Sequence, residues 1–182
     1  MIDSFRTRNG NGNGTIGQGW VGGALVFGLI EKWIDKTNRS YFADSKSSIV
    51  FEGLFSGYFS RSLLEATRFV VVDEIPFPNV PVLKRVMSGG AVGITFKHIY
   101  YLAPSVASDP SVHFHELVHV LQWRYLGAKP FIQRYLMETL RHGYRDAPLE
   151  VMSYALQKRF DERGEPFDVE SCVHKHLKGL PL

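Results

Sequence analysis

The chain has 182 residues, a formal net charge of +3, and hydrophobic residues at 45% of its positions. These values are those of a globular protein and exclude a disordered or fibrous chain, while the length suits one domain with a buried core. Basic residues are interspersed with acidic ones, so we expect no nucleic-acid partner. Cys172 is the one cysteine, so the sequence offers no pair for an intramolecular disulfide.

The N-terminal part begins with a polar segment rich in Asn and Gly, residues 1–15, which we expect to be a flexible leader. Residues 16–30 are uncharged, apolar and glycine-rich, and they open a predicted helical segment over 16–47. This stretch lacks the flanks of a secretory signal and is shorter than the about 20 apolar residues of a membrane span. Two interpretations stay open: a buried or dimer-forming helix, or a membrane-associated or targeting segment. We expect a cytoplasmic protein, or one exported without a cleavable signal peptide.

The next part, residues 48–104, is predicted to be β-rich. Residues 61–67 resemble one or two helical turns, and 68–74 are β-branched and short, which predicts a strand. Residues 75–81 hold three prolines and predict a loop, followed by a connection over 84–93. Ile94–Leu102 is again β-rich and is predicted to form the second strand.

Three helices are predicted over residues 108–165. The first begins at Asp109-Pro110 and ends at Gly127, with apolar residues at helical spacing between them. The second covers 130–142 and the third covers 146–160, with a proline in its first turn. Residues 166–182 are expected to form a C-terminal tail. The pattern predicts an α+β fold, with one domain over residues 16–182.

Residues 115–119 on the first of these helices read His-Glu-Leu-Val-His. Residues four apart lie on one face of a helix, so His115 and His119 would bind one zinc ion through two imidazole nitrogens. Glu116 lies one position further round and would reach a water in the open fourth site. Zinc lowers the pKa of such a water to near 7, and the carboxylate would take its proton as general base. The alternative is two histidines satisfied within a core, with Glu116 on the surface.

A catalytic zinc site normally takes a third protein ligand. The acidic and imidazole side chains that follow the motif are Glu138, His142, Asp146 and Glu150. We expect Glu138 to serve packing in the second helix. Asp146 is expected to cap the third helix, so that backbone N–H groups would occupy its carboxylate. Glu150, one turn inside the third helix, and His142 stay open as the third ligand.

Three segments together resemble the small bacterial zincin-like domains: Gly93 to Tyr100, the segment HELVHVLQ that begins at His115, and the segment YRDAPLEVMSYA that begins at Tyr144. Some of these domains occur as minimal metalloproteases and others in contractile-injection-system proteins. The resemblance covers about residues 82–160 and implies a minimal zincin-like fold. By similarity to gluzincins, it implies that Glu150 is the third zinc ligand. The alternative for Glu150 is a solvated glutamate favoured by the helix dipole.

Two positions depart from this resemblance. Met152 stands where such domains often carry a second acidic residue, and Tyr154 stands where thermolysin-like enzymes place an aspartate that orients a ligand histidine. The residues that fix the histidine tautomers are therefore not identified. Tyr144 is our candidate for a hydrogen bond to the developing oxyanion, and the alternative is a tyrosine that only packs. His98 could face the cleft or the solvent and is interpreted as a surface residue. His113 faces elsewhere on its helix, and we expect no specific role for it, nor for His174 and His176. The alternative for His142 is an ordinary charge at the end of its helix.

The sequence thus predicts a zinc-dependent metallopeptidase. Zn²⁺ would be held by His115, His119 and Glu150, with Glu116 as general base. Ile94–Leu102 would line the cleft and pair with an extended peptide or protein substrate. Two alternatives stay open: a non-catalytic zinc-binding structural or recognition domain, and a membrane- or secretion-associated module that acts through residues 16–30. The oligomeric state is left open.

Overall fold

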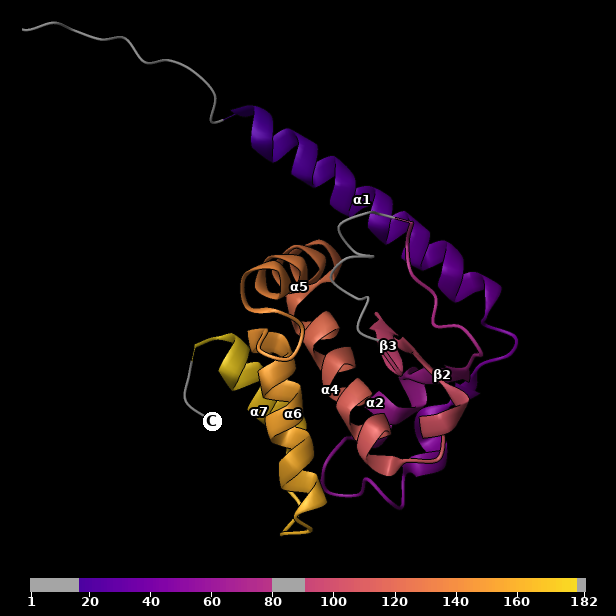
Figure 1. Cartoon of the computed structure of the whole chain (residues 1–182). Coiled ribbons are helices and arrows are strands. Elements are labelled where there is room, and N and C mark those ends of the chain that lie inside the picture. The colour runs from indigo at the N-terminus through magenta and orange to yellow at the C-terminus, as the bar shows by residue number, and fades with distance from the viewer. Residues whose placement is uncertain (1–16, 80–90, 180–182) are drawn as a thin grey trace, which may run out of the picture.

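The computed structural model describes residues 17–79 and 91–179. The expected leader over 1–15 and most of the expected connection over 84–93 lie outside these residues. A small four-stranded sheet lies on one side of the long helix α4 (Pro110–Leu126). Helices α6 (Pro148–Asp161) and α7 (Val169–Leu177) lie on the other side of α4, and α5 (Ala128–His142) crosses one end of it (Figure 1). The described residues therefore form an α+β fold.

The sheet has the strand order β1-β2-β4-β3. The strands are β1 (Lys46–Ser47), β2 (Arg68–Val71), β3 (Gly93–Phe96) and β4 (Ile99–Leu102). β2 and β4 are parallel, whereas the two outer pairs are antiparallel. β4 lies inside the sheet and all four of its side chains are 0% exposed, while β3 forms the edge. The predicted strand at 68–74 is confirmed over β2.

The prediction of one continuous strand over Ile94–Leu102 is wrong. The chain turns back at Lys97 and His98, so this segment forms the hairpin β3–β4. Lys97 adopts a left-handed φ of 61°, which suits a tight hairpin turn. Its ammonium group lies 2.6 Å from Asp35 and 3.1 Å from Glu31, both on helix α1 (Gly17–Ser40). The turn contains no glycine, so sequence pattern alone does not show it.

Helix α4 starts and ends as predicted. The Asp109 side chain accepts a hydrogen bond from the Ser111 N–H, Pro110 occupies the first turn, and Gly127 ends the helix with φ of 80°. Its residues from His113 to Trp123 are all buried, because the sheet, α5, α6 and α7 surround the helix. The helix is therefore the centre of the core, and its polar side chains must find partners inside the protein.

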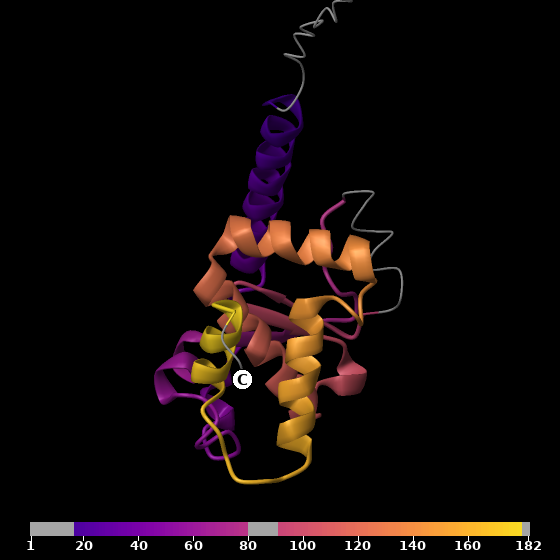
Figure 2. The same ribbon diagram turned by 90° about the vertical axis from the view of Figure 1, so that its left-hand side faces the viewer.

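Two further segments complete the core. The expected C-terminal tail instead contains α7, capped by Asp168 and packed on α4 through Val169 and Val173. The short helix α2 (Arg61–Ala66) confirms the predicted helical turns before β2. The predicted helix at the N-terminus is α1, whose first half extends beyond the other described elements in both views (Figures 1 and 2). None of the helices within residues 17–79 and 91–179 is long and apolar enough to cross a membrane.

Candidate metal centre

Two imidazole rings face each other on the buried side of α4. The Nε2 atoms of His115 and His119 are 3.0 Å apart, and both side chains are nearly inaccessible to solvent. One helical turn separates the two residues, so the backbone of α4 sets this spacing. The alternative of Glu116 on the surface is wrong, since Glu116 is 5% exposed.

Glu150 brings the third group from the first turn of α6. Its Oε2 atom lies 3.3 Å from His115 Nε2, and its Oε1 atom lies 3.4 Å from His119 Nε2. In a tetrahedral zinc site with bonds of about 2.0–2.1 Å, neighbouring ligand atoms are about 3.3–3.4 Å apart. The three side chains therefore have the spacing of a tetrahedral site with one position left for another group. The alternative of a solvated Glu150 is wrong, since only 1% of this residue is exposed.

Gln122 determines which nitrogen of His119 is available. The Gln122 amide nitrogen donates to Leu149 O at 2.9 Å, which turns its Oε1 atom toward His119 Nδ1 at 2.8 Å. An amide oxygen only accepts, so His119 Nδ1 carries a hydrogen and Nε2 is directed at the centre. This is the arrangement in which metal-binding histidines are usually held.

Gln157 plays the same part for His115. Its Oε1 atom lies 3.1 Å from His115 Nδ1, since α6, which carries Gln157, packs against α4, which carries His115. Tyr154, which occupies the position of the expected aspartate, packs its ring on His115 with centroids 4.5 Å apart. The two glutamines thus supply the orienting partners that we could not identify from the sequence.

Helix α5 supports Glu150 in two ways. The Tyr135 hydroxyl donates to Glu150 Oε1 at 2.8 Å. Glu138, one turn later, accepts the Leu149 N–H at 2.8 Å and is itself held by Arg134 Nε at 2.6 Å. Glu138 lies outside the group that could hold a metal ion, and beyond the expected packing it caps the helix that carries Glu150.

The expected cap at Asp146 is also wrong. Ala147 is the N-terminal flanking residue of α6 and no side chain of its own caps the helix, while Asp146 is exposed. The other open candidate, His142, is exposed at the end of α5 and does not belong to the buried group. Within the described residues, the one group of at least three His, Cys, Asp or Glu side chains that could hold a metal ion is His115, His119 and Glu150.

Glu116 is held beside this group by the edge strand β3. Thr95 Oγ1 donates to Glu116 Oε2 at 2.6 Å. Gly93 leaves room for the other carboxylate oxygen, since a Cβ atom at Gly93 would lie 2.5 Å from Glu116 Oε1. Burial raises the pKa of Glu116, and the nearby His119 and His115 partly oppose this shift. The carboxylate is therefore a stronger base than a solvated glutamate.

The electrostatics of the three predicted ligands couple a negative carboxylate to the two imidazoles. Burial alone would lower the pKa of His119, but Glu150 and Glu116 oppose it and raise this pKa to about 9. Burial would likewise raise the pKa of Glu150, yet His119 and His115 lower it well below its usual value. Glu150 Oε2 has no hydrogen-bond partner among the described residues. An ionised, buried carboxylate with one oxygen that accepts no hydrogen bond is a strong ligand for a cation.

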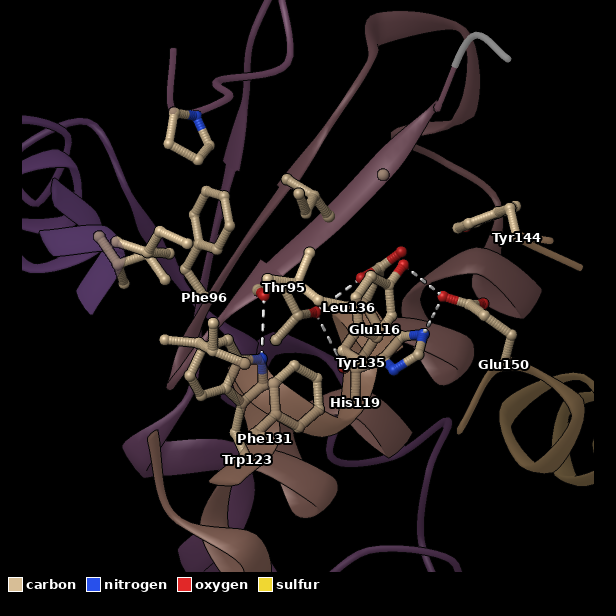
Figure 3. Close-up of a pocket in the computed structure, with 16 residues that line it drawn as sticks. Thr95, Phe96, Glu116, His119, Trp123, Phe131, Tyr135, Leu136, Tyr144 and Glu150 are labelled. Atoms are coloured by element: carbon tan, nitrogen blue, oxygen red, sulfur yellow. Dashed lines mark hydrogen bonds and ion pairs between the residues drawn. The ribbon is translucent and has the colours of Figure 1, made fainter. Parts of the chain in front are cut away.

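A pocket opens beside these side chains (Figure 3). It encloses ≈ 610 Å³, including the part open to solvent, and Glu116, His119 and Glu150 lie in its wall. The rest of the wall is mainly apolar and comes from α1, β3 and α5, through Ile30, Ile34, Phe96, Phe131, Ile132 and Leu136. The arrangement places a polar, ion-binding end next to a hydrophobic space.

The other candidates from the sequence are divided between this pocket and the rest of the molecule. Tyr144 lines the pocket together with Tyr135, and burial, followed by Glu150, raises the pKa of its phenol so that it stays protonated. His98 is exposed on the β3–β4 turn, and His174 stacks on Tyr125 with centroids 4.7 Å apart. These two histidines do not face the centre.

His113 is a structural residue of α4. Its Nε2 atom lies 2.9 Å from Ala107 O, to which it must donate, so its Nδ1 atom accepts from the Tyr100 hydroxyl at 2.8 Å. The prediction that it faces away from the centre is confirmed.

Sequence reasoning missed Gln122, Gln157, Tyr135, Thr95 and Gly93 as parts of this site. Gln122 follows His119 by three residues and lies one turn away, which is a recognisable local signal. The other four come from β3, α5 and α6, and their approach to the motif depends on packing. Comparisons with protein-family models, curated proteins and solved structures found no match for this chain.

Proposed function

We propose that this chain is a zinc-dependent metallopeptidase of the gluzincin type. The observation that carries the proposal is the spacing of 3.0 to 3.4 Å between His115 Nε2, His119 Nε2 and the carboxylate oxygens of Glu150. Two imidazoles and one carboxylate are a donor set typical of catalytic zinc. When bound, zinc would supply a Lewis acid that polarises a carbonyl group and acidifies a water molecule.

The chain's own residues would then move the proton. Glu116 accepts it as general base, because its pKa is raised by burial and one carboxylate oxygen is not bound to Thr95. That oxygen, Oε1, faces the strand at Gly93. Thr95 keeps the carboxylate in one orientation, which preserves the geometry between base and substrate.

The edge strand β3 offers a place for an extended substrate. Ala103 N donates to Val92 O at 2.8 Å, and the antiparallel alternation then directs the main-chain groups of Gly93 and Thr95 toward the free edge. Thr95 O is already taken by the Trp123 indole N–H at 3.0 Å. The N–H and C=O of Gly93 and the N–H of Thr95 would therefore pair with a peptide.

The same pocket suggests which substrate side chain fits. Its apolar wall would accept a bulky hydrophobic residue next to the scissile bond, because binding there would bury the apolar surface of that residue away from water. Tyr144 would donate a hydrogen bond to the oxygen on which negative charge develops.

Three variants test the proposal. Glu150→Ala should lose bound zinc and peptide hydrolysis together, whereas Glu116→Gln should keep zinc and lose hydrolysis. His142→Ala is the matched control, since this histidine is exposed on α5 outside the buried group, and it should keep both. Zinc content is measured on the purified proteins, and hydrolysis on a library of peptides with apolar residues.

Two results would contradict the proposal. Full zinc content in the purified Glu150→Ala protein would show that Glu150 is not the third ligand. Stoichiometric zinc with no cleavage of any peptide by the parent protein would favour a non-catalytic zinc-binding domain. In that case Glu116→Gln would leave every measured property of the protein unchanged.

A further inference from the structure

Helix α1 carries a continuous exposed stripe. Leu25, Leu29, Lys32, Lys36 and Arg39 follow one another at intervals of four and three residues, which places them on one face of a helix. All five are exposed, and Leu25 and Leu29 are 67% and 58% exposed. We refer to these five residues as the outer stripe. Its first part is apolar and its second part is basic.

The opposite face of α1 is held against the body of the protein. Ile30 and Ile34 are buried, and the Trp33 ring packs edge-on against Phe96 with centroids 5.5 Å apart. Asn38 donates to Phe96 O at 2.9 Å and accepts from the Tyr101 hydroxyl at 2.8 Å. The helix cannot rotate without breaking these contacts, so the outer stripe is fixed on the outside.

The charges of α1 are sorted between its faces. Both acidic residues of its second half, Glu31 and Asp35, pair with Lys97 of the hairpin turn. The ion pairs of the described residues include none with Lys32, Lys36 or Arg39. The outer stripe therefore presents three positive charges beside two leucines, and no acidic side chain of residues 17–79 or 91–179 pairs with them.

We propose that the outer stripe binds an anionic lipid surface. A bilayer interface accepts both kinds of side chain on one helix, since leucines enter the acyl boundary while lysine and arginine contact lipid phosphates. A nucleic acid would not use the leucines. A second copy would bring the three basic residues of one stripe against basic residues or leucines of the other, which gives no charge complementarity.

Binding of the outer stripe to a lipid surface would also place the metal centre close to that surface. Ile30 and Ile34, on the inner face, line the pocket beside Glu116 and Glu150. An α-helix with its side chains is about 10–12 Å wide, so a bound outer stripe holds the pocket within about one helix diameter of the lipid surface. The proposal itself does not depend on the peptidase activity, because it rests on the outer face alone.

Flotation of the full chain with vesicles tests the proposal. The protein should rise with vesicles of phosphatidylcholine that contain about one third phosphatidylserine, and remain below with phosphatidylcholine alone. Lys32→Gln, Lys36→Gln and Arg39→Gln combined should lower the partition coefficient about 100-fold. The matched control removes the same charge from α6, α7 and the residue that follows α7, through Lys158→Gln, Lys175→Gln and Lys178→Gln, and should bind within about threefold of the parent.

The leucines are tested separately. Leu25→Gln with Leu29→Gln should also abolish flotation, while circular dichroism and zinc content stay as in the parent, because both side chains are exposed. Equal binding to neutral and anionic vesicles would overturn the proposal. It would also be overturned if the control variant lost as much vesicle binding as the variant without the three basic residues of the outer stripe. A second copy would instead be the occupant under two joint results. The parent would fail to float with vesicles, and sedimentation equilibrium would find the parent dimeric but the leucine variant monomeric.

Discussion

Gly93→Ala is expected to disturb the proposed general base without touching a metal ligand. The new Cβ atom would lie 2.5 Å from Glu116 Oε1 and 3.1 Å from Leu102 Cδ2. An ordinary van der Waals contact begins at 3.4 Å, so the carboxylate must move by about 0.9 Å or the strand must shift. Both neighbours are buried, which leaves little free space for the movement.

Two magnitudes follow for this variant. Overpacking of a buried site costs about 1–3 kcal/mol of unfolding free energy, and the loss of glycine entropy in the unfolded chain returns about 0.4–1 kcal/mol. A catalytic group displaced by about 1 Å costs about 100-fold in rate, so kcat/KM for peptide hydrolysis should fall by that factor. Zinc affinity should stay unchanged, because Glu116 is not a proposed ligand.

The assay combines urea unfolding, zinc titration and peptide hydrolysis. Gly53→Ala is the matched control, since a Cβ atom there meets nothing within 4 Å, and it should leave stability equal or slightly higher. In a protein that already carries Glu116→Ala, the loss of unfolding free energy caused by Gly93→Ala should be at least about 1 kcal/mol smaller than in the parent. The reason is that the Glu116 carboxylate, the closest neighbour of the new Cβ atom, is then absent. A Gly93→Ala protein as stable and as active as the parent would refute the reasoning.

Three further predictions concern the support of the centre. Gln122→Met removes the acceptor at His119 Nδ1 and should weaken zinc binding about 10- to 100-fold, as measured by competition with a chelating dye. Glu138→Ala removes the cap of α6 and should lower unfolding free energy by about 1 kcal/mol, with a parallel loss of zinc affinity; an unchanged unfolding curve would show that the cap has no energetic role. Removal of zinc by a chelator should lower the melting temperature, since free zinc at 100 times its Kd stabilises a fold by about 2.7 kcal/mol. Equal melting temperatures with and without excess zinc would count against a resident metal.

Local patterns predicted some parts of the structure well. Asp109, Pro110 and Gly127 bound α4 as expected, because capping and termination depend on residues within one turn. The spacing of His115 and His119 likewise follows from helix geometry alone. Local patterns leave both Glu150 and His142 as possible third ligands, and the resemblance to gluzincins favours Glu150. The structure brings the Glu150 carboxylate within 3.4 Å of both histidines.

Other parts depend on contacts between segments far apart in the sequence. The hairpin turn at Lys97 has no glycine and is accompanied by ion pairs to α1, 62 and 66 residues earlier. The C-terminal segment forms a helix because Val169 and Val173 have α4 to pack against. No pattern within a single helix or strand contains this information.

The sequence by itself determined the α+β class, the bounds of α4 and the shared face of the two histidines, since each is set by interactions within a few residues. Tertiary structure alone decided the surroundings of that face. It brought Gln157 to His115 across 42 residues, placed Tyr135 on Glu150, and made Glu138 rather than Asp146 the cap of α6. The reason is that a buried polar group takes its partner from whichever element packs nearest, and the packing of helices is fixed only when the whole core assembles.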